Sequence, residues 1–101
     1  MDHQIGWHPE AYNELHAIAE YISLDSEAYA AAVVTRIVSA ADDLMHFPLM
    51  GRRVPEWDDD AIRERIVNSY RLIYRVRDAR VLILAVIHGA RMLPDDIRDR
   101  R

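Results

Sequence analysis

Apolar and polar positions recur with two different periods along the chain, and the change of period separates a helical part from a strand part. Between residues 9 and 46 the apolar positions recur at spacings of three and four, which is typical of amphipathic helices. From residue 62 onward they alternate every second residue or run unbroken, which is typical of strands. Helices followed by a run of strands predict an α+β fold.

The helical part predicts two helices. The first runs from about Pro9 to Ser23, because proline suits a first helical turn and the apolar residues that follow form one stripe. The second runs from about Ser26 to His46, with a polar N-cap at its start and Phe47-Pro48 at its end. The short link between two helices of this length predicts an antiparallel helical hairpin.

The strand part, together with the N-terminal segment, predicts a four-stranded sheet. Its strands are Gln4 to Trp7, Ile62 to Val67, Tyr70 to Arg77 and Val81 to Ile87, and Asn68-Ser69 is a turn. The last strand is unbroken and apolar, so we expect it to lie inside the sheet, buried on both faces. Its hairpin partner then covers one edge and the N-terminal strand covers the other, which gives the order first, fourth, third, second. We expect a mainly antiparallel sheet with the helical hairpin packed on one face.

Two segments lie outside these elements. Residues 48–60 contain two prolines, one glycine and three consecutive acids, which argue against regular structure and predict a long loop. After the sheet, Pro94 to Arg98 is expected to add one short helical turn.

The length of 101 residues is that of one ordinary domain, so we expect a single domain over residues 1–101. The absence of cysteine excludes a disulfide framework and thiolate chemistry. The longest apolar run, Val81 to Ile87, is too short to cross a membrane, and the N-terminus shows no secretory signal. A cytoplasmic protein without membrane contact is expected.

The charge is unevenly distributed, although the net charge is only −4. Residues 1–62 carry 3 Arg and 12 acids, which gives −9, whereas residues 63–101 carry 10 Arg and 5 acids, which gives +5. All 13 basic residues are arginines. The basic segment is typical of a surface for a polyanion or an acidic partner, and ordinary surface arginines are the alternative.

Metal and cofactor sites are not predicted. The five histidines lack the spacing of metal ligands, and Asp58-Asp59-Asp60 lacks the alternation of a calcium loop. The three glycines of the chain are too few and too far apart for a phosphate-binding loop.

Arginines recur at alternate positions of the two central strands. Arg63 and Arg65 share one face of their strand, and Arg71 and Arg75 share one face of the next. We expect all four on the same face of the strand pair, opposite the helices. Arginines side by side on a sheet repel unless carboxylates of this chain, carboxylates of a partner or phosphates lie between them. A solvated open face is the alternative interpretation.

Four segments, in order, resemble the ParE/RelE toxin superfamily. They are Trp7 to Ala11, Phe47 to Arg52, Ile62 to Val76, which is similar to the central hairpin of that family, and Val86 to Leu93, which is similar to its last strand. The resemblance implies the same fold and the toxin half of a type II toxin–antitoxin pair, which stabilises plasmids or slows growth. It also implies a cognate antitoxin as partner, in a toxin–antitoxin hetero-oligomer.

The superfamily contains two mechanisms. RelE-like members cut mRNA on the ribosome; here Arg63, Arg71 or Arg75 would hold the phosphate, His88 would act as acid or base, and Arg91 would clamp a neighbouring phosphate. The chain has no lysine, no tyrosine after His88 and an acidic balance, which disfavours this mechanism.

ParE-like members poison DNA gyrase by binding it and perform no chemistry of their own, and we favour this interpretation. A degenerate toxin that only binds an antitoxin is the third alternative. For partner binding we expect Arg52, Arg53 and Trp57, of which Trp57 is either an exposed interface anchor or a lid on the core.

Overall fold

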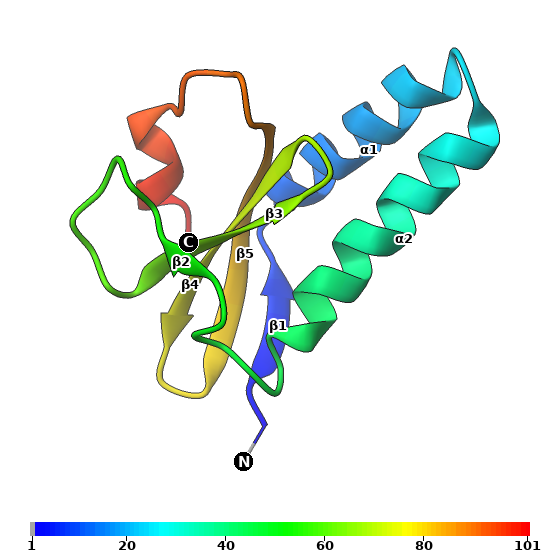
Figure 1. The fold of residues 1–101 in the computed structure, drawn as a ribbon. Coiled ribbons are helices and arrows are strands. Elements are labelled where there is room, and N and C mark those ends of the chain that lie inside the picture. The colour runs from blue at the N-terminus through cyan, green and yellow to red at the C-terminus, as the bar shows by residue number, and fades with distance from the viewer. Residues whose placement is uncertain (1) are drawn as a thin grey trace.

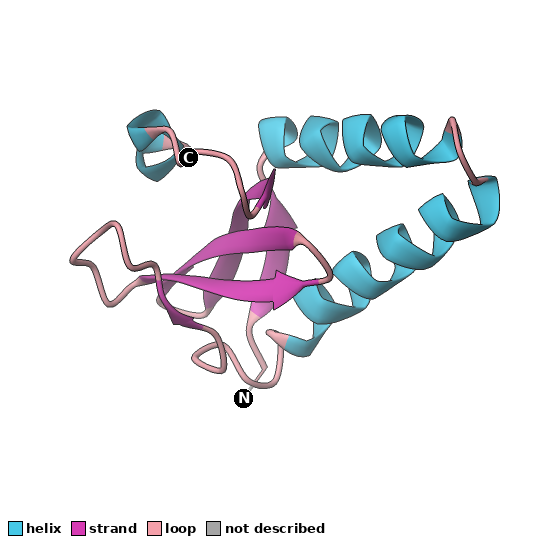
Figure 2. Cartoon of the chain, turned by 45° about the horizontal axis from the view of Figure 1, so that its top comes forward, coloured by secondary structure: helices cyan, strands magenta, loops and turns pink. Residues whose placement is uncertain are grey.

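The computed structural model describes residues 2–101. The chain forms β1 (Gln4–Trp7), α1 (Pro9–Ser23), α2 (Glu27–Asp43), β2 (Arg52–Arg53), β3 (Ile62–Val67), β4 (Tyr70–Arg77), β5 (Arg80–His88) and the 3₁₀ turn η1 (Asp95–Asp99). The two helices form a hairpin that packs on one face of the sheet, and its tip extends beyond the sheet (Figures 1 and 2). Among the described residues, neither helix is long and apolar enough to cross a membrane.

The sheet has the order β1-β5-β4-β3-β2, in which β1 is parallel to β5 and every other pair is antiparallel. The predicted order of the four longer strands is confirmed. The prediction of a loop throughout residues 48–60 is wrong at Arg52–Arg53, which pairs with Arg63 and Glu64 as a fifth, edge strand. The prolines at 48 and 55 lie outside this pair of residues, so both of its N–H groups are available for pairing.

Polar caps fix the starts of the helices. The His8 ring accepts a hydrogen bond from the Glu10 amide at 3.1 Å, and the Ser26 hydroxyl accepts one from the Tyr29 amide at 3.1 Å. The second helix ends at Asp43, three residues before the predicted end, and continues as a turn. Arg65 of β3 donates to the Ala40 carbonyl at 2.9 Å, and so supplies a positive charge at the helix C-terminus.

The sheet is covered on both faces, and each face carries an apolar core. The first core lies between the sheet and the helices, and we call this side the helix face. The second core lies on the opposite face, beneath the loop after β2 and the turn η1; it comprises Val54, Trp57, Ile62, Ile73, Leu84, Ala85, Ile87 and Ile97. The alternative of a solvated open face is therefore wrong.

A bulge in β5 serves both cores. The register passes from Ile73↔Ala85 to Tyr74↔Ile83, so Leu84 is an extra residue without a partner in β4. Leu84 and Ala85 consequently both contribute to the second core, whereas Ile83 and Val86 contribute to the first. The expectation that this strand is buried on both faces is confirmed.

Gly51 lies where β2 approaches the hydroxyl of Tyr74, and this contact gives the first testable prediction. A Cβ at Gly51 would lie 2.6 Å from both the Glu64 carbonyl oxygen and Tyr74 Oη. The Gly51 amide already donates a hydrogen bond to Tyr74 Oη at 3.0 Å. We expect Gly51→Ala to lower the free energy of unfolding by about 1–3 kcal/mol through overpacking, as measured by urea denaturation.

Gly6→Ala is the matched control. A Cβ at Gly6 would meet only the Leu82 side chain, at an ordinary 3.8 Å. This variant should change the free energy of unfolding by less than about 1 kcal/mol, in the stabilising direction. Equal unfolding curves for the two variants would show that the chain does not approach Tyr74 closely at Gly51.

Candidate functional site

The arginines of β3 and those of β4 lie on opposite faces of the sheet, and the expectation of one shared face is wrong. Residues that face each other in an antiparallel pair share a face, and the register pairs Arg63 with Tyr74 and Arg65 with Leu72, both on the helix face. Arg71 pairs instead with Ile66 and lies on the side of the second core. The physical reason is the two-residue turn at Asn68-Ser69, which pairs each odd-numbered residue of β3 with an even-numbered residue of β4.

Arg71 is held between two carboxylates. Its Nε donates to Glu64 Oε1 at 2.6 Å, while Nη1 and Nη2 donate to the two oxygens of Glu56 at 2.7 and 2.8 Å. Glu64 is only 1% exposed, and its second oxygen accepts from Arg52 Nε at 2.7 Å. These four residues, Arg52, Glu56, Glu64 and Arg71, form what we call the buried ion network. Its carboxylates raise the pKa of Arg71. All three guanidinium nitrogens of Arg71 are bound to these carboxylates rather than to a ligand.

The arginines of β3 hold the fold through backbone oxygens. Arg63 donates to the carbonyls of Asp60 at 3.1 Å and Gly51 at 3.0 Å, so it ties the loop after β2 to the sheet. Arg65 joins β3 to the end of α2 and also meets the Asp43 carboxylate at 3.2 Å. Neither side chain reaches Arg71 across the sheet.

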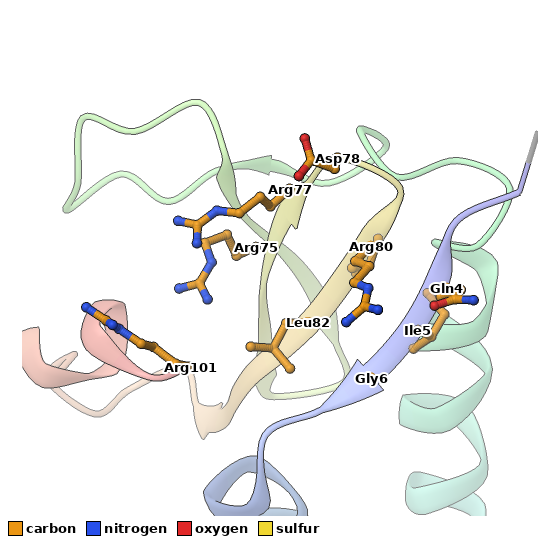
Figure 3. A pocket seen from close by; sticks show the side chains of 10 residues that line it. Gln4, Ile5, Gly6, Arg75, Arg77, Asp78, Arg80, Leu82 and Arg101 are labelled. Carbon is orange, nitrogen blue, oxygen red and sulfur yellow. The ribbon is translucent and has the colours of Figure 1, made fainter.

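Arg75 lies near the opposite end of β4 from Arg71. Its Nη1 donates to the Arg100 carbonyl at 3.0 Å. Burial lowers the pKa of Arg75, and the positive charges of Arg77 and Arg101 lower it further. Arg75 is therefore a member of a separate group of arginines, which Figure 3 shows around one hollow of the surface.

His88 and Arg91 are the two predicted catalytic residues that the structure brings together. They line a hollow of about 400 Å³ between α1 and the last two strands, together with Glu14 and Tyr70. The His88 ring meets Tyr70 edge to face at 5.5 Å, and its Nδ1 accepts from the Ala90 amide at 3.1 Å. The neutral ring therefore carries its proton on Nε2. This hollow is thus lined by one proton donor, His88, and by one guanidinium group, that of Arg91. Arg63, Arg71 and Arg75 do not line it.

Trp57 is a lid on the core, which is the second of the two alternatives expected for it. It is 4% exposed, lies in the second core, and directs its Nε1 toward Asp95 Oδ1 at 3.4 Å. An exposed interface anchor at this position is excluded in the free chain, because the ring is covered by the turn η1 and by Arg98, whose guanidinium carbon lies 5.6 Å from the ring centre. Arg52 pairs with Glu64, and Arg53 pairs with Asp58 and Asp60, while the two arginine side chains remain 62% and 48% exposed.

The sequence reasoning missed Glu64 and Arg100. Glu64 interrupts the apolar face of β3 between Ile62 and Ile66, and an acid in such a row is a signal of a buried ion pair. Arg100 binds both oxygens of Glu14 at 3.0 and 3.1 Å and donates to the Leu84 carbonyl at 2.7 Å, which is the carbonyl of the bulge residue. No local pattern in the sequence identifies that partnership.

Comparisons with known proteins agree on one family. The family model described as the ParE toxin of the type II toxin–antitoxin system parDE matches residues 5–93. Toxin RelE2 of Caulobacter vibrioides is 33% identical over 90 residues, which cover 88% of this chain and 98% of that protein.

Solved structures share the fold. The chromosomal ParDE system from P. aeruginosa matches with a TM-score of 0.70 at 21% identity, over 85% of this chain and 95% of the other. The toxin–antitoxin complex RelBE2 from Mycobacterium tuberculosis matches with a TM-score of 0.63 at 24% identity, over 87% and 99% of the two chains. A variant of the E. coli toxin RelE with two arginine-to-alanine substitutions, in the free state, matches with a TM-score of 0.66 at 15% identity, over 99% of this chain and 94% of the other.

The buried ion network predicts that Arg71 is needed for folding. Arg71→Met leaves the buried Glu64 carboxylate without one of its two cations, so we expect the free energy of unfolding to fall by about 3–5 kcal/mol. The double variant Arg71→Met/Glu64→Met removes the stranded charge, and should recover a large part of that loss in urea denaturation. A double variant as unstable as the sum of both single variants would contradict the network.

The same network predicts a stability difference that depends on pH. The hydrogen bond from Arg71 holds the pKa of Glu56 below its ordinary value of 4.5. The contribution of the ionised Glu56 carboxylate to the free energy of unfolding is therefore complete above pH 4.5, and it is lost as the pH falls through the lowered pKa. Wild type should exceed Glu56→Gln in free energy of unfolding at neutral pH, and the two should converge in acid. A difference that stays constant into acid would show that the Glu56 carboxylate is not bound by Arg71.

Proposed function

Because the chain belongs to the ParE toxin family of type II toxin–antitoxin systems, we propose that it acts by binding and poisoning DNA gyrase, without bond-making chemistry of its own. The observation that carries this proposal is the state of Arg71. The guanidinium that would clamp a scissile phosphate is engaged by Glu64 and Glu56 instead. A poison that works by binding needs no such clamp.

The distribution of the other candidate residues supports the same conclusion. RNA cleavage needs an acid or base and phosphate-stabilising donors within hydrogen-bond reach of one phosphodiester. Here Arg63 lies on the helix face, Arg75 lies near the far end of β4, and only Arg91 shares a hollow with His88. The five residues do not surround one phosphate.

A cognate antitoxin is the proposed regulatory partner. The similar solved structures from P. aeruginosa and M. tuberculosis are a ParDE toxin–antitoxin system and the toxin–antitoxin complex RelBE2. Large apolar side chains are exposed along the helical hairpin of this chain, including Tyr21 at 74% and Leu24 at 82%. An acidic and hydrophobic segment of an antitoxin would cover such side chains.

RelE-like cleavage of mRNA on the ribosome is the second candidate. It is favoured by the hollow that His88, Arg91 and Tyr70 line, and by the 33% identity with Toxin RelE2. In that mechanism His88 would protonate the leaving oxygen, and Arg91 would stabilise the phosphate.

The gyrase proposal predicts trapped cleavage complexes. Purified protein, added to gyrase with ATP and a relaxed or supercoiled plasmid, should produce linear DNA after denaturation of the enzyme with detergent and protease. In cells, expression should stop growth and cause filamentation, because unrepaired DNA breaks block division. Co-expression of the cognate antitoxin should abolish both effects, and a reaction without gyrase should show intact plasmid.

Two results would contradict the gyrase proposal. Normal supercoiling in the presence of excess protein, together with codon-phased mRNA cutting that falls by at least about 100-fold in His88→Ala or Arg91→Ala, would establish the ribonuclease instead. Tolerance of high expression without antitoxin would establish a chain that only binds an antitoxin.

A further inference from the structure

Five arginines converge where β4 turns into β5, and we call them the arginine cluster. They are Arg75, Arg77, Arg80, Arg98 and Arg101, and they come from three segments of the chain: the end of β4, the start of β5, and residues 98–101. Figure 3 shows Arg75, Arg77, Arg80 and Arg101 around the hollow above Leu82. Of these five arginines, only Arg75 is among the site residues predicted from the sequence.

The arginine cluster lacks counter-charges. Within residues 2–101 no ion pair involves any of its five members, whereas Arg52, Arg53, Arg65, Arg71 and Arg100 each pair with a carboxylate. Two acids, Asp78 and Asp99, line the same hollows and balance only part of the charge. The mutual repulsion also lowers the pKa of Arg75, after the effect of burial.

The cluster surrounds two adjoining hollows of different character. One, of about 390 Å³, is lined by Arg75, Arg77, Arg98, Asp99 and Arg101 and is mainly polar. The other, of about 380 Å³, is mainly apolar: Gly6 and Leu82, which face each other across β1 and β5, lie in its lining, and Arg80 lies beside them. Arg75, Arg77 and Arg101 line both hollows.

We propose that the arginine cluster binds the phosphodiester backbone of a nucleic acid, with phosphate in the polar hollow and a sugar or base over Gly6 and Leu82. Guanidinium groups bind phosphate oxygens in a planar, bidentate geometry, and single-stranded nucleic acids alternate an anion with an apolar face. An anion at this place would also relieve the repulsion among the five arginines.

An acidic peptide fits this place less well. Extended peptides are held mainly through main-chain hydrogen bonds at the edge of a sheet. The hollows open on the face of the sheet, where the inner side of the edge strand β1 pairs with β5 and β5 pairs with β4. The donors that remain for a ligand are side-chain cations. The inference goes beyond the proposed function, because it concerns the free chain without gyrase, ribosome or antitoxin.

Binding of a fluorescent single-stranded oligonucleotide, measured by anisotropy with the purified chain alone, tests the proposal. At about 50 mM salt, Arg77→Ser should weaken binding at least about fivefold, and should lower the slope of log affinity against log salt by about one. Arg77 makes no hydrogen bond through its side chain in the described structure, so the variant should retain its unfolding midpoint. Gly6→Leu, which fills the apolar hollow without a change of charge, should weaken binding at least about threefold.

Arg36→Ser on α2 is the matched control. It removes the same charge from an exposed arginine remote from the cluster, and should change the affinity by less than about twofold. Similar affinities for DNA and RNA oligonucleotides support recognition of the backbone, and a preference for one identifies the source of the phosphates.

Three results would overturn the inference. One is absence of binding at low salt. Another is an equal loss of oligonucleotide affinity in Arg77→Ser and Arg36→Ser, which would show non-specific electrostatic attraction rather than binding at a defined site. The third is displacement of the oligonucleotide by polyglutamate as readily as by unlabelled oligonucleotide, with no effect of Gly6→Leu, which would assign the cluster to an acidic protein partner.

Discussion

The structure depends on one buried carboxylate. Glu64 lies in the middle of β3 with 1% exposure, and an unpaired charge at such a position would destabilise the fold by several kcal/mol. Two guanidinium groups, from Arg52 and Arg71, neutralise it and in doing so join the edge strand β2 to β3 and β4. Because Arg71 also binds Glu56, the loop after β2 is drawn over the second core, where Trp57 covers the apolar side chains. A single acid thus determines the position of a strand, a loop and a core.

Because of this constraint, two sets of arginines have different roles. Those of β3, together with Arg52, Arg71 and Arg100, are bound to carboxylates or carbonyls and hold elements together. Those of the arginine cluster, near the β4–β5 turn, have no carboxylate partner among the described residues and are available to an anion. The chain belongs to the ParE toxin family of type II toxin–antitoxin systems. In this chain the sheet arginines are engaged in the fold, which favours function by binding.

Much of the fold could be predicted from periodicity, because element boundaries and strand order follow from local patterns and from the burial of β5. The faces of the arginines also follow from the sequence, because a two-residue turn at Asn68-Ser69 requires that Arg63 and Arg71 lie on opposite faces. Other features depend on contacts between distant residues and have no local pattern. Examples are the strand at Arg52–Arg53, the bulge at Leu84 and the role of Arg100. The site was predicted least well, since alternation places arginines on a strand but does not identify their partners.

The central claim is that Arg71 holds the fold together, whereas the arginine cluster binds an anion. Nuclear magnetic resonance of the arginine Nε–H groups, recorded with and without an oligonucleotide, tests it most directly. Arg71 Nε–H, bonded to Glu64 at 2.6 Å, should exchange slowly with water and keep its chemical shift at saturation, while Arg77 and Arg101 should shift. A shift of the Arg71 signal on addition of the oligonucleotide, with no change at Arg77 and Arg101, would contradict the account.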